Sequence, residues 1–124
     1  MKQVHTESAP AALGPYSQGI VVENFLFTSG QIGIDPATGH MVEGGLTAQA
    51  EQVMKNLSAI LKEAGTSTDK IVKTTCFLAD VNDFAAFNQV YAKYITQKPA
   101  RSCFAVKDIP AGALCEVEVI AYLK

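Results

Sequence analysis

The sequence is poor in the residues that most often build metal and redox centres. It has three cysteines and two histidines among 124 residues, and no two cysteines have the Cys-x-x-Cys spacing. Zinc sites and redox motifs need several such side chains at close spacing. We therefore expect no metal site, and we expect Cys76, Cys103 and Cys115 to be reduced thiols.

Long apolar runs and an excess of positive charge are also missing. No stretch approaches the ~20 apolar residues of a transmembrane helix, and residues 1–7 lack the apolar core of a secretion signal. The net charge is −2, with acidic and basic residues interspersed, so no basic stripe could neutralise a phosphate backbone. These absences predict a cytoplasmic protein with neither a membrane nor a nucleic acid as partner.

Charged residues make up only 18% of the chain, whereas hydrophobic residues make up 48%. A chain of this length without a linker or a low-complexity run is expected to form one domain, residues 1–124. The high apolar content predicts that part of its surface is covered by another subunit. We therefore expect a homo-oligomer.

Hydrophobic periodicity is clearest in residues 47–64, where apolar side chains follow the spacing of one helix face. Thr47 is the expected N-cap and Gly65 the expected C-terminal residue of this helix. A second helix is expected to be capped by Asn82 or Asp83 and to end at Pro99.

Alternating or β-branched segments predict about six strands, with a tight hairpin at Glu23-Asn24 in which Asn24 adopts the left-handed conformation. The strand expected at residues 71–79 has apolar residues on both faces, so we expect it in the interior of the sheet. Two helices packed on one face of a six-stranded mixed sheet form an α+β fold. The expected strands are residues 3–7, 19–22, 25–29, 71–79, 102–106 and 113–123.

The last of these strands raises an electrostatic question. Strand alternation places Glu116 and Glu118 on one face together with large apolar residues. A buried carboxylate needs a cation, a hydrogen-bond donor or water, because an unpaired buried charge is costly. Arg101 is the obvious candidate, either as a structural partner of these glutamates or as a residue that binds a ligand carboxylate through two parallel hydrogen bonds.

Glu116, Glu118 and Cys103 are also candidates for a chemical role. Glu116 could act as a base or orient a water molecule, whereas Glu118 is equally compatible with a solvent-exposed position or a subunit contact. Cys103 could be a nucleophile, but neither histidine is close to it in sequence, which favours a structural thiol.

Five short motifs lie in order along essentially the whole chain. They are Gly14–Gln18, Phe27–Gln31, Phe87–Tyr91, Pro99–Cys103 and Leu114–Glu118. Each motif is weak alone, and their ordered combination is specific. Together they resemble the RidA (YjgF/Rid) family of reactive-intermediate deaminases. Val117 is a mild departure, since isoleucine or methionine is expected there in many relatives.

The resemblance implies a chorismate-mutase-like α+β fold assembled as a homotrimer, with the helices outside and ligand clefts between subunits. It also implies hydrolysis of 2-iminoacids, or their enamine tautomers, released by pyridoxal-phosphate-dependent dehydratases. The products are 2-oxoacids and ammonia, and no cofactor is needed.

By the same resemblance, Arg101 binds the substrate carboxylate and Glu116 positions the attacking water. The residues that line or support the pocket are Tyr16, Ser29, Gly30, Asn88 and Cys103. Two other functions remain open at this point: a ligand-binding or stress-associated trimer without turnover, and a ribonuclease or translation inhibitor.

Overall fold

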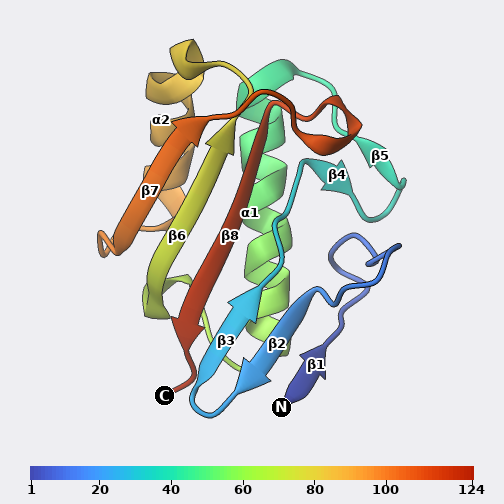
Figure 1. Cartoon of the computed structure of the whole chain (residues 1–124), viewed down its shortest axis with the longest axis vertical. Coiled ribbons are helices and arrows are strands. Elements are labelled where there is room, and N and C mark those ends of the chain that lie inside the picture. Colours follow the sequence, from blue (N-terminus) through green and yellow to red (C-terminus); the bar gives the residue numbers. More distant parts are fainter.

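The computed structural model, which describes residues 1–124, has one mixed six-stranded sheet with two helices on one of its faces (Figure 1). This confirms the α+β prediction. The helices are α1 (Gly45–Glu63) and α2 (Phe84–Tyr94). The strands of the sheet are β1 (Lys2–Val4), β2 (Gly19–Val22), β3 (Phe25–Thr28), β6 (Ile71–Leu78), β7 (Ala100–Ala105) and β8 (Cys115–Tyr122).

The strand order is β1-β2-β3-β8-β6-β7, so the last strand of the chain lies inside the sheet. All pairs are antiparallel except β6 and β7, which are parallel and are joined through α2. The apolar strand β6 is paired on both sides, as predicted. Because β8 is inserted between β3 and β6, its two glutamates lie on an interior strand of the sheet.

The two faces of the sheet differ because side chains alternate along each strand. On β8, the residues from Cys115 to Ala121 at odd positions are buried beneath the helices, and they belong to one core of 21 buried residues. The opposite face has no helix over it, and it exposes Phe25, Phe27 and Phe104. An uncovered sheet face carrying large aromatic side chains is typical of a subunit contact.

The ends of α1 confirm one prediction and correct another. Gly65, at φ +87°, follows the C-cap, and Thr66 N–H donates to the Leu61 carbonyl, which completes a Schellman motif. Thr47 is not the N-cap, because the helix begins at Gly45 and its N-cap is Gly44, at φ +117°. Two glycines in left-handed conformations there start the helix earlier than the Thr47 signal suggested.

Asp83 is the N-cap residue of α2, as predicted, although its side chain makes no capping hydrogen bond. Asp80 caps the short 3-10 turn before the helix, where its carboxylate accepts from the Asn82 N–H. Two other boundaries differ from the prediction. The helix ends at Tyr94, well before Pro99. Strand β7 consequently begins at Ala100, earlier than expected.

The tight hairpin between β2 and β3 is confirmed, but Glu23 rather than Asn24 has the left-handed conformation, with φ +53°. The sequence analysis did not predict the two-stranded ribbon formed by β4 (Ile34–Asp35) and β5 (His40–Met41). Neither α1 nor α2 has the length and apolarity needed to cross a membrane.

Candidate functional site

Arg101 lies on the edge strand β7 and points toward the helix-covered side of the sheet. It is paired in register with Thr74 of β6, which is in turn paired with Val119 of β8. Laterally paired residues share a face of a sheet, and Thr74 and Val119 are both buried beneath the helices. The guanidinium is therefore directed at α2.

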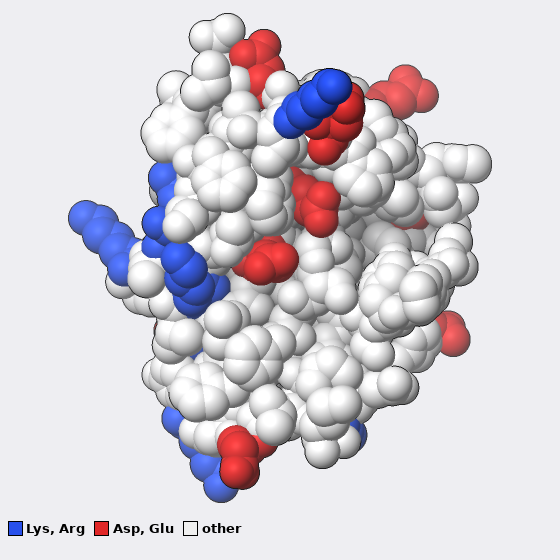
Figure 2. Space-filling model, viewed as in Figure 1, with Lys and Arg blue, Asp and Glu red and all other residues white.

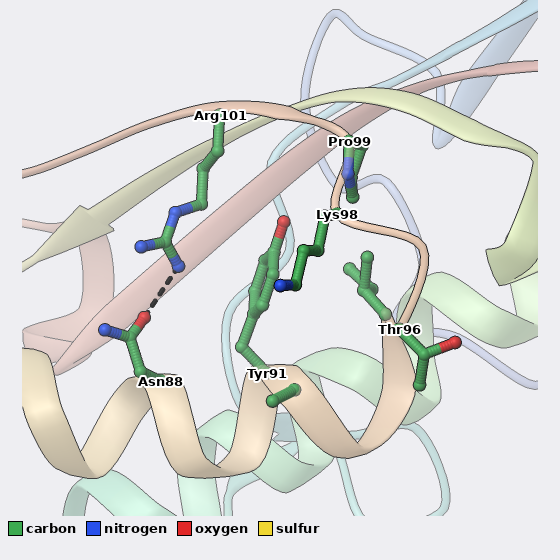
Figure 3. Close-up of a pocket in the computed structure, with 8 residues that line it drawn as sticks. Asn88, Tyr91, Thr96, Lys98, Pro99 and Arg101 are labelled. Atoms are coloured by element: carbon green, nitrogen blue, oxygen red, sulfur yellow. Dashed lines mark hydrogen bonds between the residues drawn. The ribbon is translucent and has the colours of Figure 1, made fainter.

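Three side chains of α2 hold the Arg101 guanidinium. Its Nη1 donates to Asn88 Oδ1 at 2.7 Å, and its Cζ lies 4.8 Å from the ring centroid of Tyr91 (Figure 3). The ring centroid of Phe84 lies 5.5 Å from the same Cζ. Aromatic contacts and an amide acceptor restrict the orientation of this planar group. The remaining N–H donors are available to a ligand.

A cavity of about 390 Å³ opens beside this guanidinium. Figure 3 shows Arg101 and Lys98 entering it from the β7 side and Asn88 and Tyr91 from α2. No acidic residue lines the cavity. Two cations without a neighbouring carboxylate form a site suited to an anion.

Glu116 faces the opposite, uncovered side of the sheet. Its register partner on β6 is Phe77, whose ring packs edge-on against Phe104 at 5.5 Å between centroids. The carboxylate lies directly against Gly30, where a Cβ would overlap its Oε2 atom. The position therefore requires glycine for close approach, and this requirement is separate from any contact with a ligand.

A second cavity, of about 440 Å³, is formed around Glu116. It brings together four predicted site residues, since Tyr16, Ser29 and Gly30 line it with Glu116. The other lining residues are mostly apolar: Pro10, Ala11, Leu13, Gln31, Ile32, Ile34 and Pro110.

Burial raises the pKa of Glu116, and repulsion from Glu118 raises it further. A carboxylate with a raised pKa holds a proton more readily near neutral pH, which suits a general base. The position of Glu118 is exposed.

Arg101 and Glu116 do not meet within one chain. The only ion pair joins Lys93 to Glu51, between the two helices, so the expected partnership of Arg101 with Glu116 or Glu118 is not formed in the single chain. The physical reason is register: Arg101 shares a face with Val119, and Glu116 lies on the other face. Each chain therefore carries two separate candidate sites, one on each face of the sheet.

Comparison with known proteins identifies the family. The family model described as Endoribonuclease L-PSP, which represents the YjgF/RidA proteins, matches residues 6–123. The mouse protein named 2-iminobutanoate/2-iminopropanoate deaminase is 46% identical, over 97% of this chain and 90% of that protein. The chain belongs to the RidA family.

Two solved structures show the same fold. RidA from the Antarctic bacterium Psychrobacter sp. PAMC 21119 is 41% identical, with a TM-score of 0.95 over 98% of this chain and 99% of that one. Escherichia coli TdcF, solved with bound serine, is 39% identical, with a TM-score of 0.94 over 98% of both chains. The six-stranded sheet and two helices of this chain are thus the RidA architecture.

Two predicted site residues of this RidA-family chain have definite structural partners. The Ser29 hydroxyl donates to the Ser17 carbonyl at 2.6 Å, which holds the loop that carries Tyr16. Cys103 is paired in register with Cys76 on the Arg101 side of the sheet, and burial raises its pKa. A protonated thiol is a poor nucleophile, which agrees with the structural interpretation of Cys103.

Sequence reasoning missed Tyr91 and Lys98 as neighbours of Arg101. Tyr91 follows Asn88 by three residues, and this spacing, which places both side chains on one face of α2, could have indicated it. No sequence pattern indicates Lys98. Its backbone has φ +58° and turns the chain between α2 and β7.

Proposed function

We propose that this chain is a 2-iminobutanoate/2-iminopropanoate deaminase that hydrolyses 2-iminoacids, or their enamine tautomers, to 2-oxoacids and ammonia. The observation that carries the proposal is the pair of candidate sites: an oriented Arg101 in a cavity without acidic residues, and Glu116 with a raised pKa in an apolar cavity. An anion-binding group and a proton acceptor are what this reaction requires. The name of the mouse relative supports the same activity.

The active cleft is proposed to form between subunits of a homotrimer. Figure 2 shows acidic side chains at the centre of the uncovered face and basic ones along the β7 edge. The edge of one copy and the face of the next are complementary in charge, and such a heterologous contact can close into a ring. Arg101 of one subunit would then lie across the cleft from Glu116 of its neighbour.

In the proposed mechanism, Arg101 binds the substrate carboxylate and thereby places the C=N carbon beside Glu116. Water adds to that carbon while its proton passes to Glu116. The tetrahedral carbinolamine takes this proton on nitrogen and gives its hydroxyl proton to Glu116 as the C–N bond breaks, which leaves the 2-oxoacid and ammonia. Ammonia then takes that proton from Glu116 and leaves as ammonium, so the carboxylate is restored.

Positioning supplies most of the acceleration in this mechanism. A protonated imine carbon is already electrophilic, so water can attack it without a covalent enzyme intermediate. The raised pKa of Cys103 fits this scheme, because no thiolate nucleophile is needed. The residues of the Arg101 site act through binding, and those of the Glu116 site act through proton transfer.

The test is release of 2-oxobutanoate from 2-iminobutanoate that a threonine dehydratase generates in situ, with semicarbazide competing for the imine. We expect the native protein to accelerate release and Arg101→Ala to lose that acceleration, because about two charge-assisted hydrogen bonds disappear. Arg101→Lys keeps the positive charge and tests whether the planar guanidinium, with its parallel N–H donors, is required. Lys55→Ala, which removes an exposed cation from α1, is the control and should be fully active. Equal acceleration by a folded Arg101→Ala protein would refute the assignment.

The second candidate is a ligand-binding trimer without turnover. TdcF was solved with bound serine, an amino acid whose carboxylate suits an arginine site. Calorimetric titration with serine and with 2-oxobutanoate, run beside the hydrolysis assay, separates the two functions. Binding of either ligand without acceleration of hydrolysis would favour the binding module.

A further inference from the structure

The buried face of α1 contains two amide side chains among its aliphatic residues. Asn56 has 0% of its surface exposed and Gln49 has 7%. Their neighbours on this face include Val53, Leu57 and Ile60, which pack in the core. A buried amide is costly unless it is fully hydrogen-bonded, so the partners of these two residues indicate what they hold in place.

Both N–H donors of the Asn56 side chain are bonded to the backbone of one short segment. Its Nδ2 donates to the carbonyls of Ile32 and Ile34 at 3.1 and 3.0 Å, and its Oδ1 accepts from Gln52 Nε2 at 2.8 Å. The backbone N–H of Ile34 also donates to the Ile32 carbonyl at 2.8 Å. The hydrogen bonds from α1 to the segment Ile32–Ile34 therefore come from a single side chain.

Gln49 holds the other side of the same region. Its Oε1 accepts from the N–H of Leu114 at 2.8 Å, just before β8 and Glu116. Gly33 packs so closely on this residue that an added Cβ would lie 2.9 Å from the Gln49 Cα. The two amides thus connect α1 to both chain segments that surround Glu116.

The segment attached to Asn56 is one wall of the Glu116 cavity. Ile32 and Ile34, both half-buried, line it together with Gly30 and Glu116. The preceding residue, Gln31, exchanges two backbone hydrogen bonds with Val117, at 2.9 and 3.1 Å. The wall is consequently held by β8 through Gln31 and by Asn56 at the Ile32 and Ile34 carbonyls. The Val42 N–H also donates to the Gly33 carbonyl at 2.9 Å.

We propose that Asn56 is a specificity-determining positioning residue, which holds the Ile32–Ile34 wall at the distance that selects the length of the substrate's aliphatic side chain. The inference rests on the proposed function. With the imine carbon beside Glu116, the side chain of a 2-iminoacid packs against these two isoleucines. Asn56 touches no substrate atom and acts only through the backbone carbonyls that it holds.

The test compares kcat and KM for 2-iminopropanoate and 2-iminobutanoate, which differ by one methylene. One methylene in a fitted apolar pocket is worth about tenfold or more in kcat/KM. Asn56→Leu keeps the branched shape and the number of heavy atoms but removes both donors, so the wall loses its hydrogen bonds to α1. We expect the preference between the two imines to change by about threefold to tenfold, chiefly in KM for the longer one.

A control variant separates positioning from stability. Leu61→Ala removes a fully buried side chain from the same helix without a hydrogen bond to the wall, and it should lower Tm while leaving the preference unchanged. If Asn56→Leu likewise lowers Tm and leaves the preference unchanged, Asn56 is only structural and the inference is wrong.

Gly33→Ala reaches the same wall by a different route and is useful if Asn56→Leu folds poorly. The added methyl must push the segment away from Gln49, because the nearest atom is backbone. We expect a changed preference here too, and a double variant whose change is smaller than the product of the two single changes. An unchanged preference in folded Gly33→Ala would also contradict the inference.

Binding measurements distinguish failure of this inference from failure of the proposed function. Propanoate and butanoate carry the same carboxylate and side chains but cannot react, so calorimetric titration reports the fit of the wall whether or not hydrolysis occurs. A native protein without hydrolysis would refute the deaminase. A ratio of the two dissociation constants that Asn56→Leu leaves unchanged would refute the role of Asn56 alone.

Discussion

At the residue scale, Glu116 shows how the fold modifies a side chain. Sequence alternation correctly placed it among large apolar residues, and its predicted partner Arg101 proved to lie on the other face. Its carboxylate is half-buried, and the charged side chain that affects its pKa is Glu118, which repels it. Asn88 and Arg101, chosen through a family resemblance, are in direct contact at 2.7 Å.

The raised pKa of Glu116 gives a prediction about stability. The folded state binds the proton of this group more tightly than the unfolded state, so ionisation destabilises the fold as pH rises through the raised pKa. Glu116→Gln removes that penalty. We expect the variant to have a higher Tm than the native protein at pH 7 and no such advantage at pH 3, as measured by calorimetry.

The same variant should lose about a hundredfold or more in kcat if Glu116 is the proton acceptor. Glu116→Gln is thus expected to raise Tm at pH 7 and to lower kcat. A Glu116→Gln protein that is less stable at pH 7 would show that the carboxylate has a stabilising partner.

Gly30 supports a second prediction at this scale. An alanine Cβ at this position would overlap Glu116 Oε2, so the carboxylate must rotate away from its present place. We expect Gly30→Ala to reduce kcat by about a hundredfold with little change in KM, because misplacement of a catalytic group by about an ångström has that effect. A normal kcat in the folded variant would mean that the Glu116 position is not critical.

At the element scale, the helices and strands were predicted from periodicity, and their ends were less accurate. The αL glycine after α1 was recognised because glycine is the usual residue there, whereas Glu23 and Lys98 adopt the same conformation without any such signal. Because α2 ends at Tyr94, β7 begins at Ala100 rather than at residue 102, and Arg101 therefore lies inside the strand.

Gly65 provides the prediction at this scale. Its φ of +87° costs an alanine about 1–2 kcal/mol, and the residue ends the long helix α1. Gly65→Ala should therefore lower the free energy of unfolding by about this amount in urea titrations, without changing the ratio of activities on the two imines. Gly39→Ala, at φ +76° in an exposed turn, is the matched comparison.

At the scale of the whole molecule, the apolar composition has a structural explanation. The helices cover one face of the sheet, and the aromatic residues on the other face remain partly exposed in the single chain. The two candidate sites, on opposite faces, leave the proposed reaction without an assembled centre unless copies associate.

We expect light scattering to give about three times the 13.2 kDa mass of one chain. Phe104→Glu, on the β7 edge, should weaken the assembly and lose hydrolysis in parallel, because a charge would enter the apolar contact. Lys55→Glu, on the outer side of α1, should do neither. A fully active monomer would contradict the intersubunit cleft.

The sequence by itself determined the α+β class, most elements and the family, because hydrophobic periodicity and short motifs are local properties of the chain. Only the tertiary structure decided which groups share a site. The parallel pairing of β7 with β6 and the insertion of β8 set the faces of Arg101 and Glu116, and these pairings join residues distant in sequence. The closeness of Gly30 to Glu116, and of Asn56 to the Ile32–Ile34 wall, depends on the same long-range register and packing.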